Sequence, residues 1–226
     1  VYGEIVRKIV PGEEVRLLVD SRKEERIARK YLSRAGALLS RVRFVIHPTN
    51  RGWTRDSGPV FVRGGRGGRS ETAIVHLHFN AWARYRDWRH DRRVPEAAAR
   101  LLGKRLFDAR LGRRPFVLEG GGIDVNGRGT LITTEECYLS RMRQVRNSGL
   151  GRGGFESALR SWLGVKNVLW LGHGIAGDDT HGHVDDICRF VNPKTLVLVR
   201  EANRHDRNYR PLAENWERIR HLRLED

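Results

Sequence analysis

The sequence predicts an α/β fold in which one structural module is repeated around a common centre. Three short polar motifs stand at nearly equal intervals: WTRDSGP at 53–59, EGGGIDVNG at 119–127 and DDTHGHVDD at 178–186. Their key side chains, Asp56, Glu119 and His183, are 63 and then 64 residues apart. Each motif is a Gly-containing turn that is followed by an apolar run typical of a strand. Equal spacing of candidate site residues, each just before a strand, indicates a repeated supersecondary unit.

The first elements follow from the apolar pattern and from a helix start signal. Residues 14–19 are predicted to form a buried strand. Ser21 and Glu24 form a capping-box pattern that opens a helix running to about Ser33. The next strand is expected at 41–47, directly in front of the first motif.

A hairpin and a helix are expected after the first motif. PVFV at 59–62 predicts a strand, and the Gly-rich segment 64–69 predicts a turn. The returning strand is expected at 71–79, where apolar residues alternate with histidine. Pro95 marks a position near the start of a helix that runs through about Leu102.

The second half repeats the same order of elements. Residues 116–134 predict strand, tight turn and strand, with Asn126-Gly127 as a hairpin signal. Further elements are a helix at 155–164, a buried strand at 167–171, two strands after the third motif and an amphipathic helix from about Pro211. Strand, strand, helix and strand thus recur about every 60 residues. Because no linker interrupts them, residues 1–226 are expected to form a single, partial domain.

The composition allows several classes of protein to be set aside. With 226 residues, 39% of them hydrophobic, the chain can bury a sizeable core. The formal net charge of +16 suggests nucleic acid binding. However, the basic residues are spread evenly, arginine outnumbers lysine by about six to one, and no basic helix or zinc-finger spacing accompanies them. We therefore expect solvated charged faces and no nucleic acid partner.

The two cysteines and the lack of long apolar segments bear on location. No segment approaches the ~18 consecutive apolar residues of a transmembrane helix, and no signal peptide is visible, so no membrane partner is expected. Cys137 and Cys188 lie beside predicted strands, where cysteine usually acts as a small apolar core residue. Two thiols without a secretory context favour reduced cysteines and a cytoplasmic location.

The third motif allows two interpretations when it is taken alone. His181, His183 and Asp185 form an H-x-H-x-D pattern similar to the zinc signature of metallo-β-lactamases. That signature has a histidine directly after the aspartate, where this chain has Asp186. The alternative is a polar turn whose carboxylates cap backbone N–H groups. The second motif does not suit a phosphate, because an acidic residue precedes its glycines. No metal and no cofactor are expected.

Taken together and in order, the motifs are far more specific. WTRDSGP, HFNAW, EGGGIDVNGRGTLITTEEC, LGVKNVLWLG and DDTHGHVDDICRFVNP resemble the agmatine deiminase family, which includes the Porphyromonas-type peptidylarginine deiminases of the guanidine-modifying (pentein) superfamily. The resemblance runs from about Glu14 to about Glu217. It implies a pentein α/β-propeller of five ββαβ modules with pseudo-fivefold symmetry, of which about three to four are expected here.

The resemblance also implies roles for the residues of the motifs. Asp56 and Asp185 match the carboxylates that bind the planar, forked guanidinium group. His183 matches the general acid/base that protonates the departing ammonia and then activates water. Glu119 matches the carboxylate that hydrogen-bonds this histidine and holds its tautomer. Trp53 is expected to line the wall of the pocket.

The nucleophile that the resemblance implies has no counterpart in this sequence. The family uses a cysteine near its C-terminus, in a Gly-rich segment ending His-Cys, to form a thiouronium intermediate. No cysteine follows Cys188, and neither Cys137 nor Cys188 has a matching context. We expect that the family's first strands and C-terminal portion are absent. A fragment of a deiminase explains this better than a pseudoenzyme does.

The expected function is a guanidine deiminase that hydrolyses agmatine to N-carbamoylputrescine and ammonia. The alternatives are a peptidylarginine deiminase, a catalytically dead guanidine-binding fragment and a zinc-dependent hydrolase. The 226 residues alone are expected to release no ureido product. An incomplete propeller exposes strand edges and core surface, so association is expected, and a homo-oligomer is one form of it.

Overall fold

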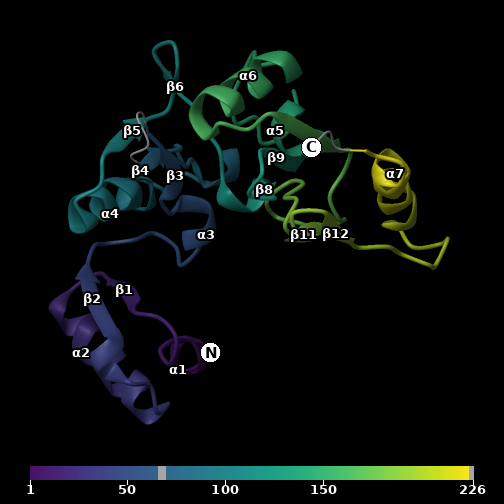
Figure 1. Ribbon diagram of the computed structural model, residues 1–226. Coiled ribbons are helices and arrows are strands. Elements are labelled where there is room, and N and C mark those ends of the chain that lie inside the picture. The colour runs from purple at the N-terminus through teal and green to yellow at the C-terminus, as the bar shows by residue number, and fades with distance from the viewer. Residues whose placement is uncertain (66–69, 224–226) are drawn as a thin grey trace.

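A strand–strand–helix–strand order governs the first complete unit of the computed structural model, which describes residues 1–65 and 70–223 (Figure 1). Strand β3 (Val60–Gly64) pairs antiparallel with β4 (Glu71–His76). Helix α4 (Val94–Leu102) follows, and β5 (Leu106–Asp108) then returns parallel to β4. The turn predicted at 64–69 lies mostly outside the described residues, although β3 and β4 pair as that hairpin requires.

The second complete unit has the same order. Strand β8 (Asp124–Val125) pairs antiparallel with β9 (Thr130–Thr134), and after helix α6 (Arg152–Leu163) strand β10 (Asn167–Leu171) lies parallel to β9. The hairpin predicted at Asn126 is confirmed, since its side-chain oxygen accepts hydrogen bonds from the backbone N–H groups of the β8–β9 loop. The mixed α/β character with several small sheets is therefore confirmed.

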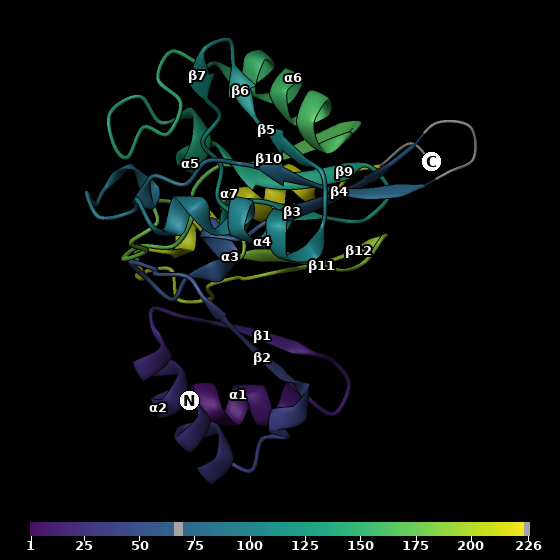
Figure 2. The same cartoon turned by 90° about the vertical axis from the view of Figure 1, so that its left-hand side faces the viewer.

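Parts of the same order occur at both ends of the chain. Near the N-terminus, β1 (Val15–Val19) and β2 (Val42–Ile46) pair in parallel around helix α2 (Arg22–Arg34). Helix α1 (Tyr2–Ile9) packs against α2. Figures 1 and 2 show this N-terminal group set apart from the other sheets and joined to them by an extended segment. It has its own apolar core of Val6, Val10, Leu32, Ala37 and Val42.

The C-terminal elements form two antiparallel strands and a helix. Strands β11 (Cys188–Asn192) and β12 (Thr195–Leu198) pair with each other, and α7 (Tyr209–Ile219) follows. Leu212 of α7 packs in one cluster with Ile132, Leu171 and Ile187. The largest core cluster lies under α6, where Phe155 and Leu159 are fully buried with residues of β9 and β10.

Local signals explain where the main helices begin and end. The Ser21 Oγ accepts a hydrogen bond from the Glu24 N–H, which caps α2 as predicted. Pro95 stands in the first turn of α4, where its missing N–H is not needed. Gly164 ends α6 in the left-handed conformation (φ +68°) that glycine adopts without strain.

The short elements and α1 were not predicted from the sequence. The short helices and strands are α3 (Thr54–Ser57), α5 (Glu135–Leu139), β6 (Arg110–Leu111), β7 (Arg114–Pro115) and the 3₁₀ turns η1 (Leu39–Arg41), η2 (Ala81–Ala83), η3 (Asp91–Arg93) and η4 (Gly120–Gly122). Residues 116–118, predicted as a strand, form only an isolated bridge between His78 and Val117. The strand predicted as buried at 14–19 is largely half-exposed, with only its last residue buried. Among the residues that the structure describes, every helix is too short or too polar to cross a membrane.

Candidate functional site

The three motifs meet at one place although they are far apart in the chain. The Nδ1 of His183 lies 3.8 Å from Asp56 Oδ1 and 3.8 Å from Asp185 Oδ1, and its Nε2 lies 3.5 Å from Glu119 Oε2. The key residue of each motif, Asp56, Glu119 or His183, lies a few residues before the first strand of a unit, namely β3, β8 or β11. Repetition of the unit therefore brings equivalent turns together.

Asp56 is fixed on α3 by two donors from other parts of the chain. Its Oδ1 accepts a hydrogen bond from the Gly121 N–H (2.9 Å), and its Oδ2 accepts one from the indole Nε1 of Trp82 (3.1 Å). The residue is 9% exposed. One carboxylate is thus oriented by both a backbone and a side-chain dipole.

Gly121 is required by the close approach of the first two motifs. A Cβ at this position would lie 2.5 Å from Nδ1 of His183 and 2.7 Å from Oδ1 of Asp56, distances that real Cβ atoms do not tolerate. The carbonyl of Gly121 also accepts a hydrogen bond from the Asp185 N–H (3.1 Å). The second motif therefore acts as the backbone bridge between the first and the third.

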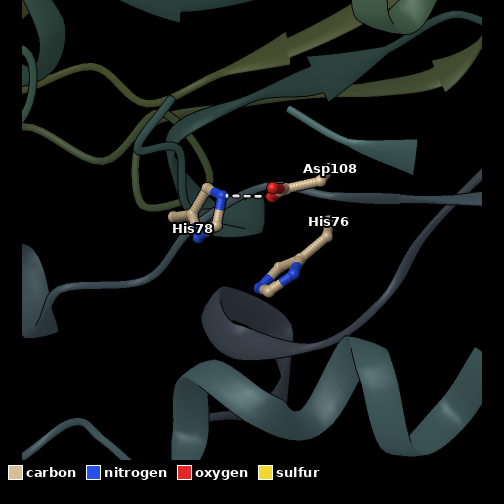
Figure 3. Close-up of side chains that lie close together, drawn as sticks. All are labelled: His76, His78 and Asp108. Atoms are coloured by element: carbon tan, nitrogen blue, oxygen red, sulfur yellow. Dashed lines mark hydrogen bonds and ion pairs between the residues drawn. The ribbon is translucent and has the colours of Figure 1, made fainter. Parts of the chain in front are cut away.

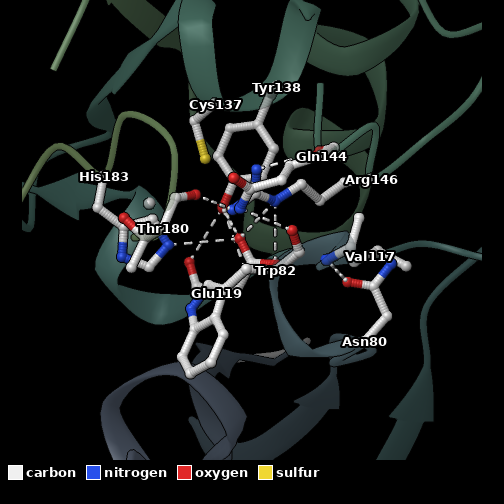
Figure 4. A network of polar contacts seen from close by, with 12 residues as sticks. Asn80, Trp82, Val117, Glu119, Cys137, Tyr138, Gln144, Arg146, Thr180 and His183 are labelled. Carbon is white, nitrogen blue, oxygen red and sulfur yellow. Dashed lines mark hydrogen bonds and ion pairs between the residues drawn. The ribbon is translucent and has the colours of Figure 1, made fainter. Parts of the chain in front are cut away.

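Glu119 is completely buried and is held by a cation and a hydroxyl (Figure 4). The Arg146 Nε lies 3.2 Å from both carboxylate oxygens, and both side chains are fully inaccessible to solvent. The Tyr138 hydroxyl lies 3.4 Å from Oε2 and also contacts the Glu119 backbone. A buried carboxylate needs such partners in order to stay ionised.

The loop that carries His183 is shaped by Asp178. The Asp178 carboxylate accepts hydrogen bonds from the backbone N–H groups of Thr180, Gly182 and His183. The interpretation of the third motif as a capped polar turn is therefore correct for Asp178. This turn presents the imidazole, which is 3% exposed, to the carboxylates of the other two motifs.

A strained turn supports the partner of Asp56. Ala81, Trp82 and Ala83 all have positive φ (52°, 59° and 51°), a left-handed conformation that costs about 1 kcal/mol or more for each non-glycine residue. The Asn80 side chain accepts a hydrogen bond from the Ala83 N–H (2.8 Å), which stabilises the turn. Strain of this kind collects at functional sites, where the surrounding structure holds it in place.

A cavity of about 480 Å³ opens beside these residues. Trp53 and Trp82 form apolar parts of its wall, and Trp53 is 63% exposed. Both Asp56 and Asp185 line the cavity together with His183. Its further lining residues are Arg51, Arg55, Tyr85, Asp179, Thr180 and Asp186. The cavity lining thus combines aromatic side chains with several carboxylates.

The electrostatics of the cavity favour a cationic ligand. Burial raises the pKa of Asp56 and of Asp185, and each is raised further by a neighbouring carboxylate, against the opposing effect of His183. Asp186 also has a raised pKa, first through burial and then through Asp178 and Asp185. Several carboxylates that repel one another are stabilised when a cation binds between them.

In the His183–Glu119 pair, unlike in the cavity aspartates, the pKa shifts favour the charged form of each side chain. Burial by itself would lower the pKa of His183, but the hydrogen bond and charge of Glu119, aided by Asp56, raise it above its ordinary value. Burial by itself would raise the pKa of Glu119, but the charges of Arg146 and His183 lower it. The imidazole is therefore disposed to hold a proton next to an ionised carboxylate.

The structure does not assemble the H-x-H-x-D pattern into a metal site. The Nδ1 of His181 lies 3.3 Å from Glu136, whereas His183 turns toward Glu119 and Asp185. Within the described part of the chain, the groups of side chains close enough to share an ion do not include His181 or Asp185.

Both cysteines are buried and lie away from the cavity lining, as far as the described residues show. Cys137 is on α5, where its sulfur lies close to Glu119 and His183, and burial raises the pKa of its thiol strongly. Arg146 pairs with Glu119 beside this thiol. Cys188 begins β11, and burial raises the pKa of its thiol to about 12. Both residues behave as the predicted core cysteines.

Three residues that shape the site were not predicted from the sequence. Trp82 lies in HFNAW, a segment used for the resemblance but without an assigned role. Tyr138 follows the second motif in TEECYL, where an aromatic residue next to a strand is usually core. Arg146 gave no signal at all, because one arginine in a loop is not distinctive in a chain so rich in arginine.

Comparison with known proteins gives consistent results. The family model for Porphyromonas-type peptidyl-arginine deiminases matches residues 1–226. The agmatine deiminase of Stutzerimonas stutzeri is 42% identical over 188 residues, which cover 80% of this chain and 48% of that protein. The chain therefore spans about half the length of this curated relative.

Two solved structures share the fold. A cysteine-to-serine variant of the C. jejuni agmatine deiminase with substrate bound superposes with a TM-score of 0.82 at 26% identity, over 97% of this chain and 60% of that one. An agmatine deiminase of Enterococcus faecalis gives a TM-score of 0.79 at 30% identity, over 95% and 56% of the two chains. With its motifs, its folded units and the family match over its full length, the chain belongs to the Porphyromonas-type peptidyl-arginine deiminase family.

Proposed function

We propose that these residues form the guanidinium-binding and acid/base part of a guanidine deiminase site, with agmatine as the substrate. The convergence of Asp56 and Asp185 on Nδ1 of His183, each at 3.8 Å in one cavity, carries the proposal. A guanidinium is planar and presents pairs of N–H donors, which carboxylates accept two at a time. The related proteins named above are agmatine deiminases, which supports this reading.

The histidine is proposed to move the protons. Protonated His183 donates from Nδ1 to the departing nitrogen, so that ammonia leaves, and the neutral ring then takes a proton from the attacking water. Glu119 accepts from Nε2 and keeps the working nitrogen directed at the cavity. Arg146 keeps Glu119 ionised while it is buried. These proton transfers require only the substrate, water and a nucleophile in addition to His183.

Neither cysteine of this chain is proposed as the nucleophile. Cys137 and Cys188 are buried, and both thiols are held protonated by raised pKa values. A thiolate is the reactive form, so both are poor nucleophiles. The family resemblance implies a cysteine in a Gly-rich segment ending His-Cys, which these 226 residues do not contain. The C. jejuni structure with substrate bound is itself a cysteine-to-serine variant. We therefore expect these residues alone to bind guanidines without turnover.

The mouth of the cavity favours agmatine over arginine. Agmatine carries a second cation at its far end, whereas free arginine carries a carboxylate there. Asp186 is an exposed residue of the cavity lining, and its side chain has no hydrogen-bond or ion-pair partner within the described ranges. The basic lining residues Arg51 and Arg55 are already engaged, with Asp87 and with the Ile123 carbonyl. An unpaired carboxylate at this place suits a terminal ammonium group.

The repeated units are proposed to belong to a pentein α/β-propeller with pseudo-fivefold symmetry. Two complete ββαβ units and the partial ones at either end support this architecture. The nearly equal spacing of Asp56, Glu119 and His183 supports it as well, because each is placed just before the first strand of a unit. The site then lies where the units converge.

Calorimetric titration of the 226-residue protein tests the substrate assignment. We expect agmatine to bind more tightly than arginine or an Nα-acylated arginine amide, and Asp186→Asn to remove most of that preference. Replacement of Glu13, an exposed glutamate outside the cavity, by Gln is the matched control. Tighter binding of the acylated arginine amide would instead favour the peptidylarginine alternative. Release of a ureido product by this protein would show that one of its two cysteines is reactive.

A further inference from the structure

Two histidines and an aspartate lie together beside α4, apart from the cavity described above. Alternation along the strand puts His76 and His78 on one face, since residues i and i+2 point the same way. The parallel pairing of β4 with β5 then places Asp108 directly opposite His76. Three residues with metal-binding side chains therefore share one corner of the sheet.

Their side chains converge (Figure 3). One nitrogen or oxygen atom from each of His76, His78 and Asp108 lies within 4.8 Å of the others. The His78 Nε2 lies 2.7 Å from Asp108 Oδ1, and the two imidazole rings are 4.3 Å apart. Both histidines are 3% exposed. A cavity of about 560 Å³ opens over the group.

The ring of His76 has a buried nitrogen that no hydrogen bond explains. Its Nε2 has no partner among the residues that the structure describes. Its Nδ1 lies 3.8 Å from Glu96 Oε1, on α4. Buried polar atoms are nearly always paired, so an unpaired nitrogen in a group of potential ligands points to a bound species. A carboxylate at the other nitrogen of a ligating histidine typically fixes its ring.

We propose that His76, His78 and Asp108 form a binding site for a divalent transition-metal ion, with Zn²⁺ as the best match. Two imidazoles and one carboxylate are a common set of three protein ligands for zinc, and the fourth position faces the cavity. Glu96 supports the His76 ring from α4. The ion ties β4, β5 and α4 together and stabilises the first ββαβ unit.

Basic neighbours set the strength of this site. Arg92 Nε donates to His78 Nδ1 (3.1 Å), so His78 Nε2 carries the proton that it shares with Asp108. An ion at Nε2 requires that proton to move to Nδ1, and Arg92 must then turn away. Arg110 holds the other carboxylate oxygen of Asp108 at 2.6 Å and leaves Oδ1 for the ion. Arg92 is therefore the group that competes with the metal.

Zinc titration of chelator-treated protein tests the site. We expect one equivalent of Zn²⁺ to bind and to raise the thermal unfolding temperature. His76→Gln and Asp108→Asn should each weaken binding by about 100-fold or more, since even supporting residues of metal sites contribute 10- to 100-fold. Arg92→Gln should strengthen it several-fold. The exposed His205→Gln is the matched control and should change nothing.

Two results would overturn the proposal. One is a wild-type protein that binds no zinc at equimolar concentration. The other is binding that the His76 and Asp108 variants leave as tight as in the wild type, which would place the ion on surface histidines. Circular dichroism without zinc shows whether each variant folds. If a ligand variant does not fold, Arg92→Gln decides the question, because unchanged or weaker binding in that variant also contradicts the site.

Discussion

Individual carboxylates in the proposed guanidinium site have pKa shifts that oppose folding. Asp56, Asp185 and Asp186 all have pKa values raised by burial and by repulsion from neighbouring carboxylates. A carboxyl group whose pKa is raised on folding favours the folded state when protonated, and loses that contribution as the pH rises through the folded pKa. At neutral pH these aspartates therefore oppose folding. A bound guanidinium would offset that effect.

Asp185→Asn tests this conflict between binding and stability. We expect the free variant to be more stable than the wild type at pH 7, because the cations closest to the carboxylate among the described residues are His183 at 3.8 Å and Arg189 at 4.0 Å. Agmatine binding should weaken about 10- to 100-fold, the range for a lost hydrogen bond to a charged group. Chemical denaturation and calorimetry measure the two effects. A variant less stable than the wild type would contradict the electrostatic argument.

The buried Glu119–Arg146 pair is expected to be sensitive to the loss of one partner. Arg146→Met leaves a carboxylate buried without its cation, which typically lowers the free energy of unfolding by about 3–5 kcal/mol. The double variant Arg146→Met/Glu119→Gln should recover part of that loss. Urea denaturation of the single and double variants measures it. Equal stability of the Arg146 variant and the wild type would show that the pair does not hold Glu119 ionised.

The raised pKa of His183 has a defined pH signature. Its contribution to stability is fully present below the ordinary histidine pKa, and it disappears as the pH rises through the higher folded pKa. The difference in unfolding free energy between the wild type and His183→Asn should therefore shrink as the pH is raised from 6 upward. Glu119→Gln should lower the His183 pKa, which NMR titration of the ring detects. A pKa unchanged by Glu119→Gln would contradict the pairing.

Among individual residues, those in the motifs could be predicted from the sequence, whereas the side chains that contact them could not. Asp56, Glu119 and His183 were marked by even spacing and by turn chemistry, which are properties of the chain itself. Arg146 pairs with Glu119 across 27 residues and through an irregular loop. No periodicity records such a contact. The roles assigned to the motif residues remain proposals.

At the scale of elements, Gly121 sets how closely two turns approach. Gly121→Ala should push His183 or Asp56 aside, lower the free energy of unfolding by about 1–3 kcal/mol and abolish agmatine binding. Gly153→Ala is a matched control within α6, where an added Cβ meets nothing within 4 Å. That change should stabilise the helix by up to about 1 kcal/mol. Normal agmatine affinity in the Gly121 variant would contradict the close approach.

Long elements were predictable because their signals are local. The cap at Ser21, the proline in α4 and the glycine after α6 each act within one turn of chain. The short elements α3, α5 and η4 were missed because contacts with distant residues stabilise them. The missed α1 is different, since Val6 and Val10 have helical spacing and are both buried. That signal was present in the sequence.

At the scale of the whole molecule, the charge of the chain and that of the site have opposite signs. The net charge of the chain is +16, yet several carboxylates line the cavity. The absence of a nucleic acid partner and the cytoplasmic location stay predictions. Any DNA binding should be non-specific, should weaken steeply with salt and should be unaffected by agmatine. Gel-shift titration at several salt concentrations checks this, and competition by agmatine would contradict it.

The repeated units give the site its architecture. The turns in front of β3, β8 and β11 contribute Asp56, Glu119 and His183, so the site forms only when the units pack together. Even spacing predicted this repetition, whereas the number of units and the propeller remain proposals. The two solved agmatine deiminases match nearly all of this chain, which in turn covers 60% and 56% of theirs.

Titration of the 226-residue protein and its Asp56→Asn and His183→Asn variants with agmatine shows whether Asp56, Asp185 and His183 jointly hold a guanidinium ion. We expect binding of one agmatine per chain by the wild type and by the Glu13→Gln control, and binding weakened about 10-fold or more in both site variants. Absence of binding by the folded wild type, or equal affinity in all four proteins, would contradict this expectation.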